Sequence, residues 1–405
     1  MLAHTRRLVG IMLPLGAGVG LAVAFALRGL AAFSPWLDHL GGRSHLSLLL
    51  PAIGLGLVTL WLSLTKIGEV SLFKDLDLAH HSPYEVFPFR KSIAKVWACA
   101  MTIGFGGSAG VEGPGKWFGS ALGLQFHRLI HGLARVAPPA RRLLAPAPMM
   151  VRAGSASALA AVFRAPLSGA LMAAEHHGRL EADALVPCLF SAAAGFMVFS
   201  GWMGLQPLLP IPRTYQAHYA ELSWALLLGL VCGLGGSAFL WLKARLRRGL
   251  DPIPFRWRGL VAGLGLVLLA LPAHFGWPGL PVTQGGGLEL IGHLLQGDTL
   301  SKHAVLFLAL KLAATALTLA GGGIGGIWLP SLAMGAATGA AFDAWLGLGQ
   351  PGYMTLVGAG AFAGATHETI LVPVVFLAET TAQAALVVPA LIATGVAFLV
   401  VRERA

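Results

Sequence analysis

"GVEGPGKW", residues 110–117, is the stretch on which the interpretation of the whole chain depends. Its Gly-x-x-x-x-Gly-Lys spacing matches that of a phosphate-binding P-loop. A P-loop follows a soluble β-strand and carries Ser or Thr after its lysine, whereas Trp117 stands there in this chain. A proline, Pro114, also lies inside the loop. The spacing therefore does not predict nucleotide binding, and we expect neither an ATP site nor an enzyme.

The composition places this stretch in a membrane protein. Hydrophobic residues make up 56% of the 405 and charged residues only 11%, against about 25% charged in a soluble chain. The net charge of +11 comes from basic residues clustered between apolar runs, as at 141–142 and 243–248. This pattern is typical of membrane-protein loops that meet anionic lipid. We therefore expect a lipid bilayer, and no nucleic acid, as the partner of the basic residues.

Apolar segments of two kinds follow one another along the chain. Uninterrupted runs long enough to cross a bilayer, roughly 17–25 residues, lie near 8–33, 45–65, 220–247, 257–275, 303–320 and 384–401. Other apolar regions are broken by Gly and Pro, at 91–130, 147–176, 184–209, 321–348 and 353–380. Broken helices are tolerated at membrane depth only where they line a cavity or are buried in protein. The pattern predicts an all-α, polytopic transporter or channel with re-entrant helices and a site built from helix ends.

Two internal matches indicate a repeat. Residues 110–123 superimpose without gaps on 326–339, which aligns Pro114 with Pro330 and Gly119 with Gly335. Residues 154–175 match 358–379 more loosely, at a nearby offset. We therefore expect one transmembrane domain over 1–405, with repeat one at about 45–210, repeat two at about 220–401 and no cytoplasmic regulatory domain. The substrate site of such a protein lies where the repeats meet.

The glutamate within the opening stretch is the main candidate functional residue. Pro114 suits the first position of a helix, with Gly113 as its cap. The N-terminus of a helix attracts anions, and Glu112 stands beside it. An intramembrane carboxylate is costly and is a functional hypothesis by default. Glu112 is thus predicted to be a tethered anion that competes with a free one; the alternative is a carboxylate that only stabilises its helix.

Several motifs together resemble the CLC family of anion channels and anion/proton antiporters. "GVEGPG" is similar to the family's Gly-x-Glu-Gly-Pro signature, and "GGIWLP" at 325–330 is similar to its Gly-x-Phe-x-Pro signature. "FRAPLSGALMAAE" at 163–175, "QGGGLELI" at 284–291 and "AETTAQAALVVPALIATG" at 378–395 resemble further family segments in the right order. The resemblance covers roughly residues 60–400.

The resemblance implies a homodimer with one anion pathway per subunit, built from inverted repeats that meet at helix N-termini. It implies that Glu112 is the gating glutamate, which occupies an anion site when ionised and leaves it when protonated. It further implies that the amides of Ile327 and Trp328 coordinate the central anion, and that Gly110, Val111 and Gly113 surround the anion as the rest of the signature. Ser71 falls at the position of the family's coordinating serine. No cofactor and no metal site are implied.

The chain also departs from the family pattern. Around Ser71 the sequence is "EVSLFKD", residues 69–75, in which only the serine matches. Val111 replaces the usual arginine. His176 stands where antiporters carry an inner glutamate, and a histidine can still carry protons near neutral pH; it could equally be a loop residue at a helix end. The family's last helix, with its anion-coordinating tyrosine, is expected to be missing, because no tyrosine follows Tyr353.

The sequence thus predicts transport of a small anion, with chloride as the default, in a bacterial-type inner (plasma) membrane. Proton exchange through Glu112 is one hypothesis. A passive channel or uniporter, and a variant selective for another anion such as fluoride, are the alternatives. A non-transporting scaffold would gain little from a buried Glu112. Lys116, which could raise the positive potential, reach the interface or pair with a carboxylate, has no counterpart in the family pattern.

Overall fold

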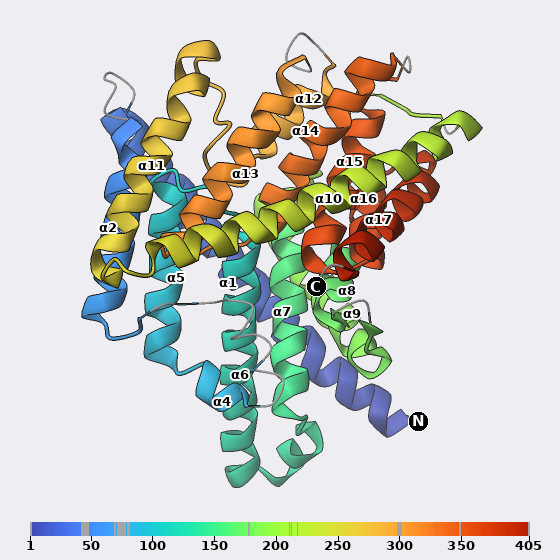
Figure 1. Cartoon of the computed structure of the whole chain (residues 1–405). Helices are drawn as coiled ribbons and strands as arrows, with labels where there is room; N and C mark the ends of the chain where they lie inside the picture. Colours follow the sequence, from blue (N-terminus) through green and yellow to red (C-terminus); the bar gives the residue numbers. More distant parts are fainter. Residues whose placement is uncertain are drawn as a thin grey trace. The chain divides into compact units, whose positions relative to one another are not determined.

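The computed structural model describes residues 2–41, 48–68, 70, 78, 82–176, 179–209, 211, 213–216, 218–297, 302–347 and 350–403. These residues are mostly helical, which confirms the predicted all-α class (Figure 1). They form two compact units, which are described separately. Unit 1 comprises Met1–Ala31, Ser71–Val96 and Glu112–Leu208; unit 2 comprises Ala32–Val70, Trp97–Val111 and Leu209–Ala405.

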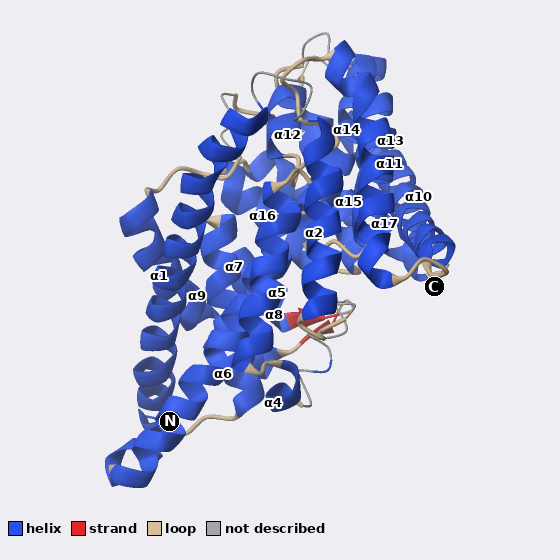
Figure 2. Ribbon diagram, turned by 90° about the vertical axis from the view of Figure 1, so that its left-hand side faces the viewer, coloured by secondary structure: helices blue, strands red, loops and turns tan. Residues whose placement is uncertain are grey.

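The first unit contains most of the elements from the N-terminal part of the chain. Two of its helices cross the unit boundary, namely α1 (Leu2–Gly41) and α5 (Phe89–Gly104). The others are α4 (Pro83–Val86), α6 (Glu112–Val136), the 3-10 turn η2 (Pro138–Leu143), α7 (Ala147–Phe163), α8 (Pro166–Ala174) and α9 (Ala182–Met203). Between α8 and α9, strands β1 (Glu175–His176) and β2 (Arg179–Leu180) pair antiparallel, shown red beside α8 in Figure 2. This short ribbon was not expected from the sequence.

The second unit contains the remaining helices. They are α2 (Leu50–Leu64), α10 (Tyr219–Leu250), α11 (Phe255–Gly276), α12 (Leu288–Leu295), α13 (Ala304–Ala320), α14 (Trp328–Leu346), α15 (Tyr353–His367), α16 (Leu371–Thr381), the turn η4 (Ala384–Leu386) and α17 (Val387–Arg402). Among the described residues, five helical spans are long and apolar enough to cross a membrane: 8–29, α9, α10, α11 and 384–402. Shorter apolar helices, including α2, α7, α13 and α16, accompany them.

Polar side chains fix the starts of two of these helices, α10 and α15. At the start of α10 the Glu221 carboxylate accepts a hydrogen bond from the His218 N–H, at 2.9 Å, as one half of a capping box. Near the end of α14 the Asp343 carboxylate accepts hydrogen bonds from the N–H groups of Gly352, Met354 and Thr355, each at 3.1 Å. Asp343 therefore occupies N–H groups at the start of α15 that have no acceptor inside that helix.

Close glycine contacts pack the helices in each unit, and they recur at equivalent positions. In unit 1, a Cβ on Gly119 of α6 would overlap the carbonyl of Gly154 on α7. In unit 2, a Cβ on Gly335 of α14 would overlap the carbonyl of Gly358 on α15. Figure 1 shows both helix pairs side by side. Gly119 and Gly335 are aligned in the predicted repeat, so the two contacts are those that a repeat would produce. The boundaries of the two repeats stay a prediction.

The helix ends that follow these pairs also correspond. Arg164, after α7, and Glu368, after α15, both adopt the left-handed conformation, with φ of 54° and 52°. They are 204 residues apart, which is the offset of the second sequence match. A left-handed residue is a common way to end a helix, but it favours glycine over residues with side chains. A left-handed conformation at a residue other than glycine, found at both matching positions, further supports the repeat interpretation.

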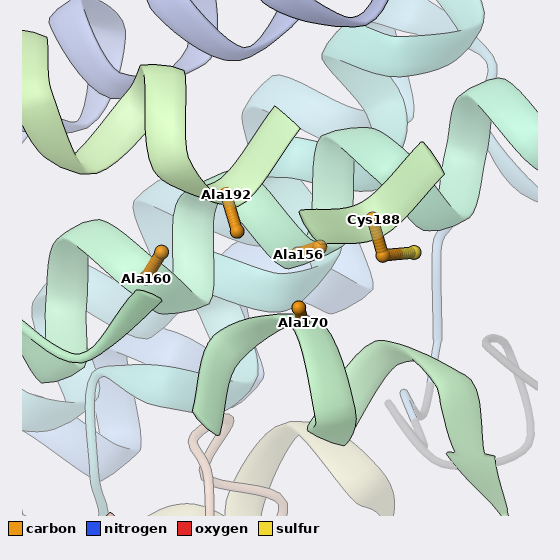
Figure 3. Close-up of a cluster of buried hydrophobic side chains, with 5 residues drawn as sticks. All are labelled: Ala156, Ala160, Ala170, Cys188 and Ala192. Atoms are coloured by element: carbon orange, nitrogen blue, oxygen red, sulfur yellow. The ribbon is translucent and has the colours of Figure 1, made fainter. Parts of the chain in front are cut away.

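Small side chains allow the three helices α7, α8 and α9 of unit 1 to approach one another. Figure 3 shows the buried cluster between them, formed by Ala156, Ala160, Ala170, Cys188 and Ala192. Four of the five members are alanines, so little space separates the backbones. This packing holds α8, a nine-residue helix, against its longer neighbours.

Candidate functional site

Glu112 begins helix α6 and is buried, with 2% of its surface exposed. The sequence predicted that the helix would start at Pro114; the structure shows that it starts two residues earlier, so that prediction is wrong. Pro114 is tolerated at the third position because the first-turn N–H groups of a helix have no acceptor inside it. The carboxylate-bearing residue thus lies in the first turn itself, where the helix dipole favours a negative charge.

Two glycines that the repeat aligns form a direct backbone pair within unit 2. The Gly110 N–H donates to the Gly326 carbonyl at 2.9 Å, and the Gly326 N–H donates to the Gly110 carbonyl at 2.8 Å. Such a reciprocal exchange is that of a hydrogen-bonded antiparallel pair. Helix α6 starts two residues after Gly110, and α14 starts two residues after Gly326. The segments that lead into the two helices therefore meet at equivalent residues.

Two more of the predicted anion-binding residues lie at the start of α14. Ile327 is the N-cap and Trp328 the first helical residue, and both are buried. The Trp328 ring packs edge-on against His367 and Phe376, with ring centroids 5.0 and 5.8 Å away. These contacts fix the indole at the start of the helix. The amides of a first helical turn can bind an anion because they have no intrahelical acceptor.

A buried polar network in unit 2 connects the segments before the two helices. Thr102 of α5 accepts a hydrogen bond from the Ile324 N–H through its Oγ1, at 3.0 Å. The Oγ1 of Thr318 accepts one from the Ser108 N–H, also at 3.0 Å, and the Ser108 and Thr315 hydroxyls lie 2.8 Å apart. Buried polar groups need such partners. The threonines of α5 and α13 thereby hold the backbone of the two segments that lead into the Gly110–Gly326 pair.

Lys311 adds a buried amine to this network, and sequence reasoning missed it. Its side chain on α13 is fully buried, and Nζ donates to the carbonyls of Gln284 and Gly285 at 2.8 and 2.7 Å. The Gly285 N–H donates in turn to the Gly107 carbonyl at 3.1 Å. The signal in the sequence was a single lysine inside an apolar run, with Thr315 and Thr318 four and seven residues later on the same helix face.

The Thr102 hydroxyl is expected to contribute to the stability of the protein. Replacing Thr102 by valine keeps the shape but leaves the buried Ile324 N–H without its acceptor, which is expected to lower the free energy of unfolding by about 1–3 kcal/mol. Thr102→Ser keeps the hydroxyl and serves as the control. Thermal unfolding of the purified variants in detergent measures the difference. Equal stability of the valine and serine variants would show that this hydrogen bond does not hold the segment.

The remaining predicted residues are distributed over both units. Gly110 and Val111 belong to unit 2 together with Ile327 and Trp328, whereas Glu112, Gly113 and His176 belong to unit 1. His176 is the second residue of β1, and its backbone is paired in register with Arg179; its side chain lies outside the described part of the structure. Ser71 also lies outside the described residues.

Two of the tyrosines are structural. The hydroxyl of Tyr353, the last tyrosine in the sequence, donates to the Ala385 carbonyl at 3.1 Å. Tyr215, in the connection before α10, donates to the Pro351 carbonyl at 3.2 Å. Burial, with a smaller contribution from the Asp343 carboxylate, raises the pKa of Tyr215 to about 12, so its hydroxyl stays protonated near neutral pH. Each tyrosine therefore ties a loop or turn to a neighbouring segment of unit 2.

The fold and these helix starts define a multi-pass membrane protein with broken helices, the construction used by ion transporters. The chain belongs to the voltage gated chloride channel family, the predicted CLC family, whose model matches residues 69–402. The family transports anions. The predicted family and the multi-pass membrane location are thereby confirmed.

Individual relatives agree with this assignment. The chain is 26% identical over 315 residues to the putative chloride channel protein ClcB-like of Ralstonia nicotianae, covering 76% of this chain and 71% of that protein. It is 28% identical over 308 residues to the H(+)/Cl(−) exchange transporter ClcA of Vibrio parahaemolyticus, covering 72% and 62%.

Solved structures show the same fold. A slow cyanobacterial Cl−/H+ antiporter matches with a TM-score of 0.81 at 20% identity, over 98% of this chain and 95% of the other. A CLC-type fluoride/proton antiporter matches with a TM-score of 0.77 at 22% identity, over the same shares of the two chains.

Proposed function

We propose that this protein exchanges protons for a small anion, chloride in the first instance, with Glu112 as the gate. The observation that carries the proposal is the burial of Glu112 in the first turn of α6, within the family's Gly-x-Glu-Gly-Pro signature. A buried carboxylate at a helix N-terminus is stabilised when ionised and becomes neutral when it binds a proton. One group can therefore respond both to anions and to protons.

In this mechanism an anion is bound by the amides of Ile327 and Trp328, with Gly110, Val111 and Gly113 supplying further backbone and Ser71 a hydroxyl. Ionised Glu112 competes with the anion for the positive end of a helix. Protonation removes the charge on Glu112, so the carboxyl no longer competes and the anion enters. Release of the proton restores the carboxylate, which displaces the anion.

Proton exchange is favoured over passive conduction by the names of several relatives of the chain. The ClcA proteins among its relatives are described as exchange transporters. The passive alternative rests on two departures from the family pattern, namely His176 where the resemblance predicts an inner glutamate and the absence of a tyrosine after Tyr353. Histidine titrates near neutral pH, so its presence is compatible with a proton route as well. We therefore propose exchange, with His176 as the inner proton residue.

Chloride is proposed as the anion because the relatives with substrate names carry chloride in those names. The fluoride/proton antiporter shares the fold, and at 22% identity its selectivity does not extend to this chain. We further propose a homodimer in a bacterial inner membrane, in line with the family's usual assembly.

The proposal is tested by reconstituting the purified protein in vesicles with a chloride gradient and recording chloride and proton movement together. We expect chloride moving down its gradient to drive protons uphill. Chloride movement without protons would support the passive alternative. Replacing chloride by fluoride in the same assay, with an equal gradient, tests the choice of anion, since faster coupled fluoride movement would reverse it.

A further inference from the structure

Lys116 lies one helical turn after Glu112 on the same face of α6. The two residues are four apart, a spacing that places Cβ atoms about 5–6 Å from each other. The Lys116 side chain is partly buried. A lysine in the second turn gains nothing from the helix dipole, whose N-terminal end carries the partial positive charge. Its presence there therefore needs an explanation outside α6.

The Lys116 amine reaches the C-terminal end of α8. Its Nζ donates to the Met172 carbonyl at 3.3 Å. Met172 lies in the last turn of α8, three residues before Glu175 and four before His176. The neighbouring carbonyls are occupied otherwise, since the Glu175 N–H donates to Leu171 and the Glu181 N–H donates to Ala174. Lys116 thus connects the helix that starts with Glu112 to the end of the helix that leads into His176, within one unit.

The other charged or titratable groups around Lys116 come from α7 and α9. Arg152 on α7 and Cys188 on α9 are close enough to interact electrostatically with the amine. The Arg152 guanidinium is itself paired with the Glu181 carboxylate. Among the residues that the structure describes, Lys116 has no carboxylate partner of its own. A lysine amine at membrane depth without a paired anion is a candidate functional group.

We propose that Lys116 is a proton-transfer residue that exchanges protons with Glu112 and carries them toward the C-terminal end of α8. The inference rests on the proton exchange proposed above and adds an intermediate proton carrier to the pathway. The four-carbon stem of lysine allows the amine to move between the Met172 carbonyl and the carboxyl one turn earlier. Proton transfer requires heavy atoms within about 2.6–3.2 Å, or one bridging water.

The proton balance has two steps. The carboxylic acid of Glu112 gives its proton to the neutral Lys116 amine, which leaves a carboxylate and an ammonium. The ammonium then gives a proton to water at the C-terminal end of α8, which restores the amine and yields a hydronium ion for the onward route. The reverse sequence carries a proton outward. No electrons are exchanged, and the only co-reactant is water.

A purely structural role makes a different prediction. Lys116 could serve only to bind the last turn of α8, a favourable position for a cation. Arginine separates the two roles, because it keeps the positive charge and the N–H donors but cannot be deprotonated in a protein. Lys116→Arg therefore preserves the contact with α8 and removes the ability to pass a proton.

The test compares the wild-type protein with K116M, K116R, K116H and K91M in vesicles under a chloride gradient, with chloride and proton movement recorded together. Lys91 is an exposed lysine of the same unit and serves as the matched control. We expect K116M and K116R to keep chloride movement while coupled proton movement falls by about 100-fold, the usual contribution of a positioned acid–base group. Histidine can carry a proton, so K116H is expected to recover part of the coupling; K91M is expected to match the wild type.

Wild-type coupling in K116R would overturn the proton-transfer role and leave Lys116 as a helix-end contact. K116R also carries the test if K116M does not fold, because it keeps the hydrogen-bond donors. Failure of the proposed proton exchange would give a different result. Wild-type protein that moves chloride without protons would contradict both the exchange and the role of Lys116. Coupled proton movement in both the wild type and K116R would contradict only the role of Lys116.

Discussion

Replacing Glu112 by glutamine is expected to abolish coupled proton movement while chloride still crosses the membrane. Glutamine has nearly the same shape as the protonated acid, but it neither takes up nor releases a proton. Its neutral amide also no longer competes as an anion for the helix N-terminus. Chloride movement should therefore become independent of pH, whereas wild-type movement follows the protonation of Glu112. Chloride efflux from vesicles at several pH values, with external pH recorded, measures both properties.

Glu85→Gln is the matched control, because Glu85 is an exposed carboxylate of α4 in the same unit. It is expected to retain wild-type coupling and pH dependence. Unchanged coupling in the Glu112→Gln protein would remove Glu112 from the mechanism and leave it as a residue that only stabilises the start of α6.

Replacing Gly339 by alanine is expected to destabilise the protein strongly. A Cβ on Gly339 of α14 would overlap the carbonyl oxygen of Met354 on α15, and backbone cannot move aside as a flexible side chain can. Overpacking of this kind costs about 1–3 kcal/mol and occasionally more, whereas alanine gains only ~0.5–1 kcal/mol over glycine within a helix. Because α14 begins with Trp328, the displaced helix should also weaken anion binding. Thermal unfolding in detergent and chloride flux are the two measurements.

Gly395 of α17 supplies the control for this substitution. A Cβ at that position would meet no atom within 4 Å, so Gly395→Ala is expected to be neutral or slightly stabilising. If Gly339→Ala unfolds at the same temperature as Gly395→Ala, then the close approach of α14 and α15 is not required for stability.

The sequence was sufficient to predict the all-α membrane fold and its family. The long apolar runs predict membrane-spanning helices, and the Gly- and Pro-broken regions predict interrupted ones. These predictions are possible because a bilayer offers backbone N–H and C=O groups no water to bind, so a spanning segment must satisfy them internally. Glu112 was identifiable because a carboxylate in an apolar, Gly-rich stretch is costly wherever it is buried. Its burial at the start of α6 agrees with that prediction, and its gating role stays a proposal.

Features that depend on contacts between distant segments could not be predicted in the same way. The Thr102–Ile324 hydrogen bond joins residues 222 positions apart, and no local pattern specifies it. Lys311 was visible as a charge in an apolar run, but its carbonyl partners at 284–285 were not. The start of α6 was misplaced because Pro114 suits either of two positions in a first turn, both of which lack an intrahelical acceptor.

The Lys116 contact belongs to the same group of long-range features. From the sequence its amine had three possible roles, and only the position of α8 shows that it reaches the Met172 carbonyl. Its neighbours on α7 and α9 are likewise brought together by the small-residue packing of unit 1. The functional inference for Lys116 therefore follows from the structure rather than from the motif in which it lies.

Whether an anion gradient drives protons through this protein can be measured with the wild-type chain alone. Vesicles containing the purified protein are loaded with high chloride, placed in low chloride at equal pH, and followed with a pH electrode and a chloride electrode. We expect outward chloride movement to acidify the vesicle interior and make the outside alkaline, and we expect a protonophore to abolish this pH change. Chloride efflux that is equally fast and leaves the external pH unchanged would contradict this expectation.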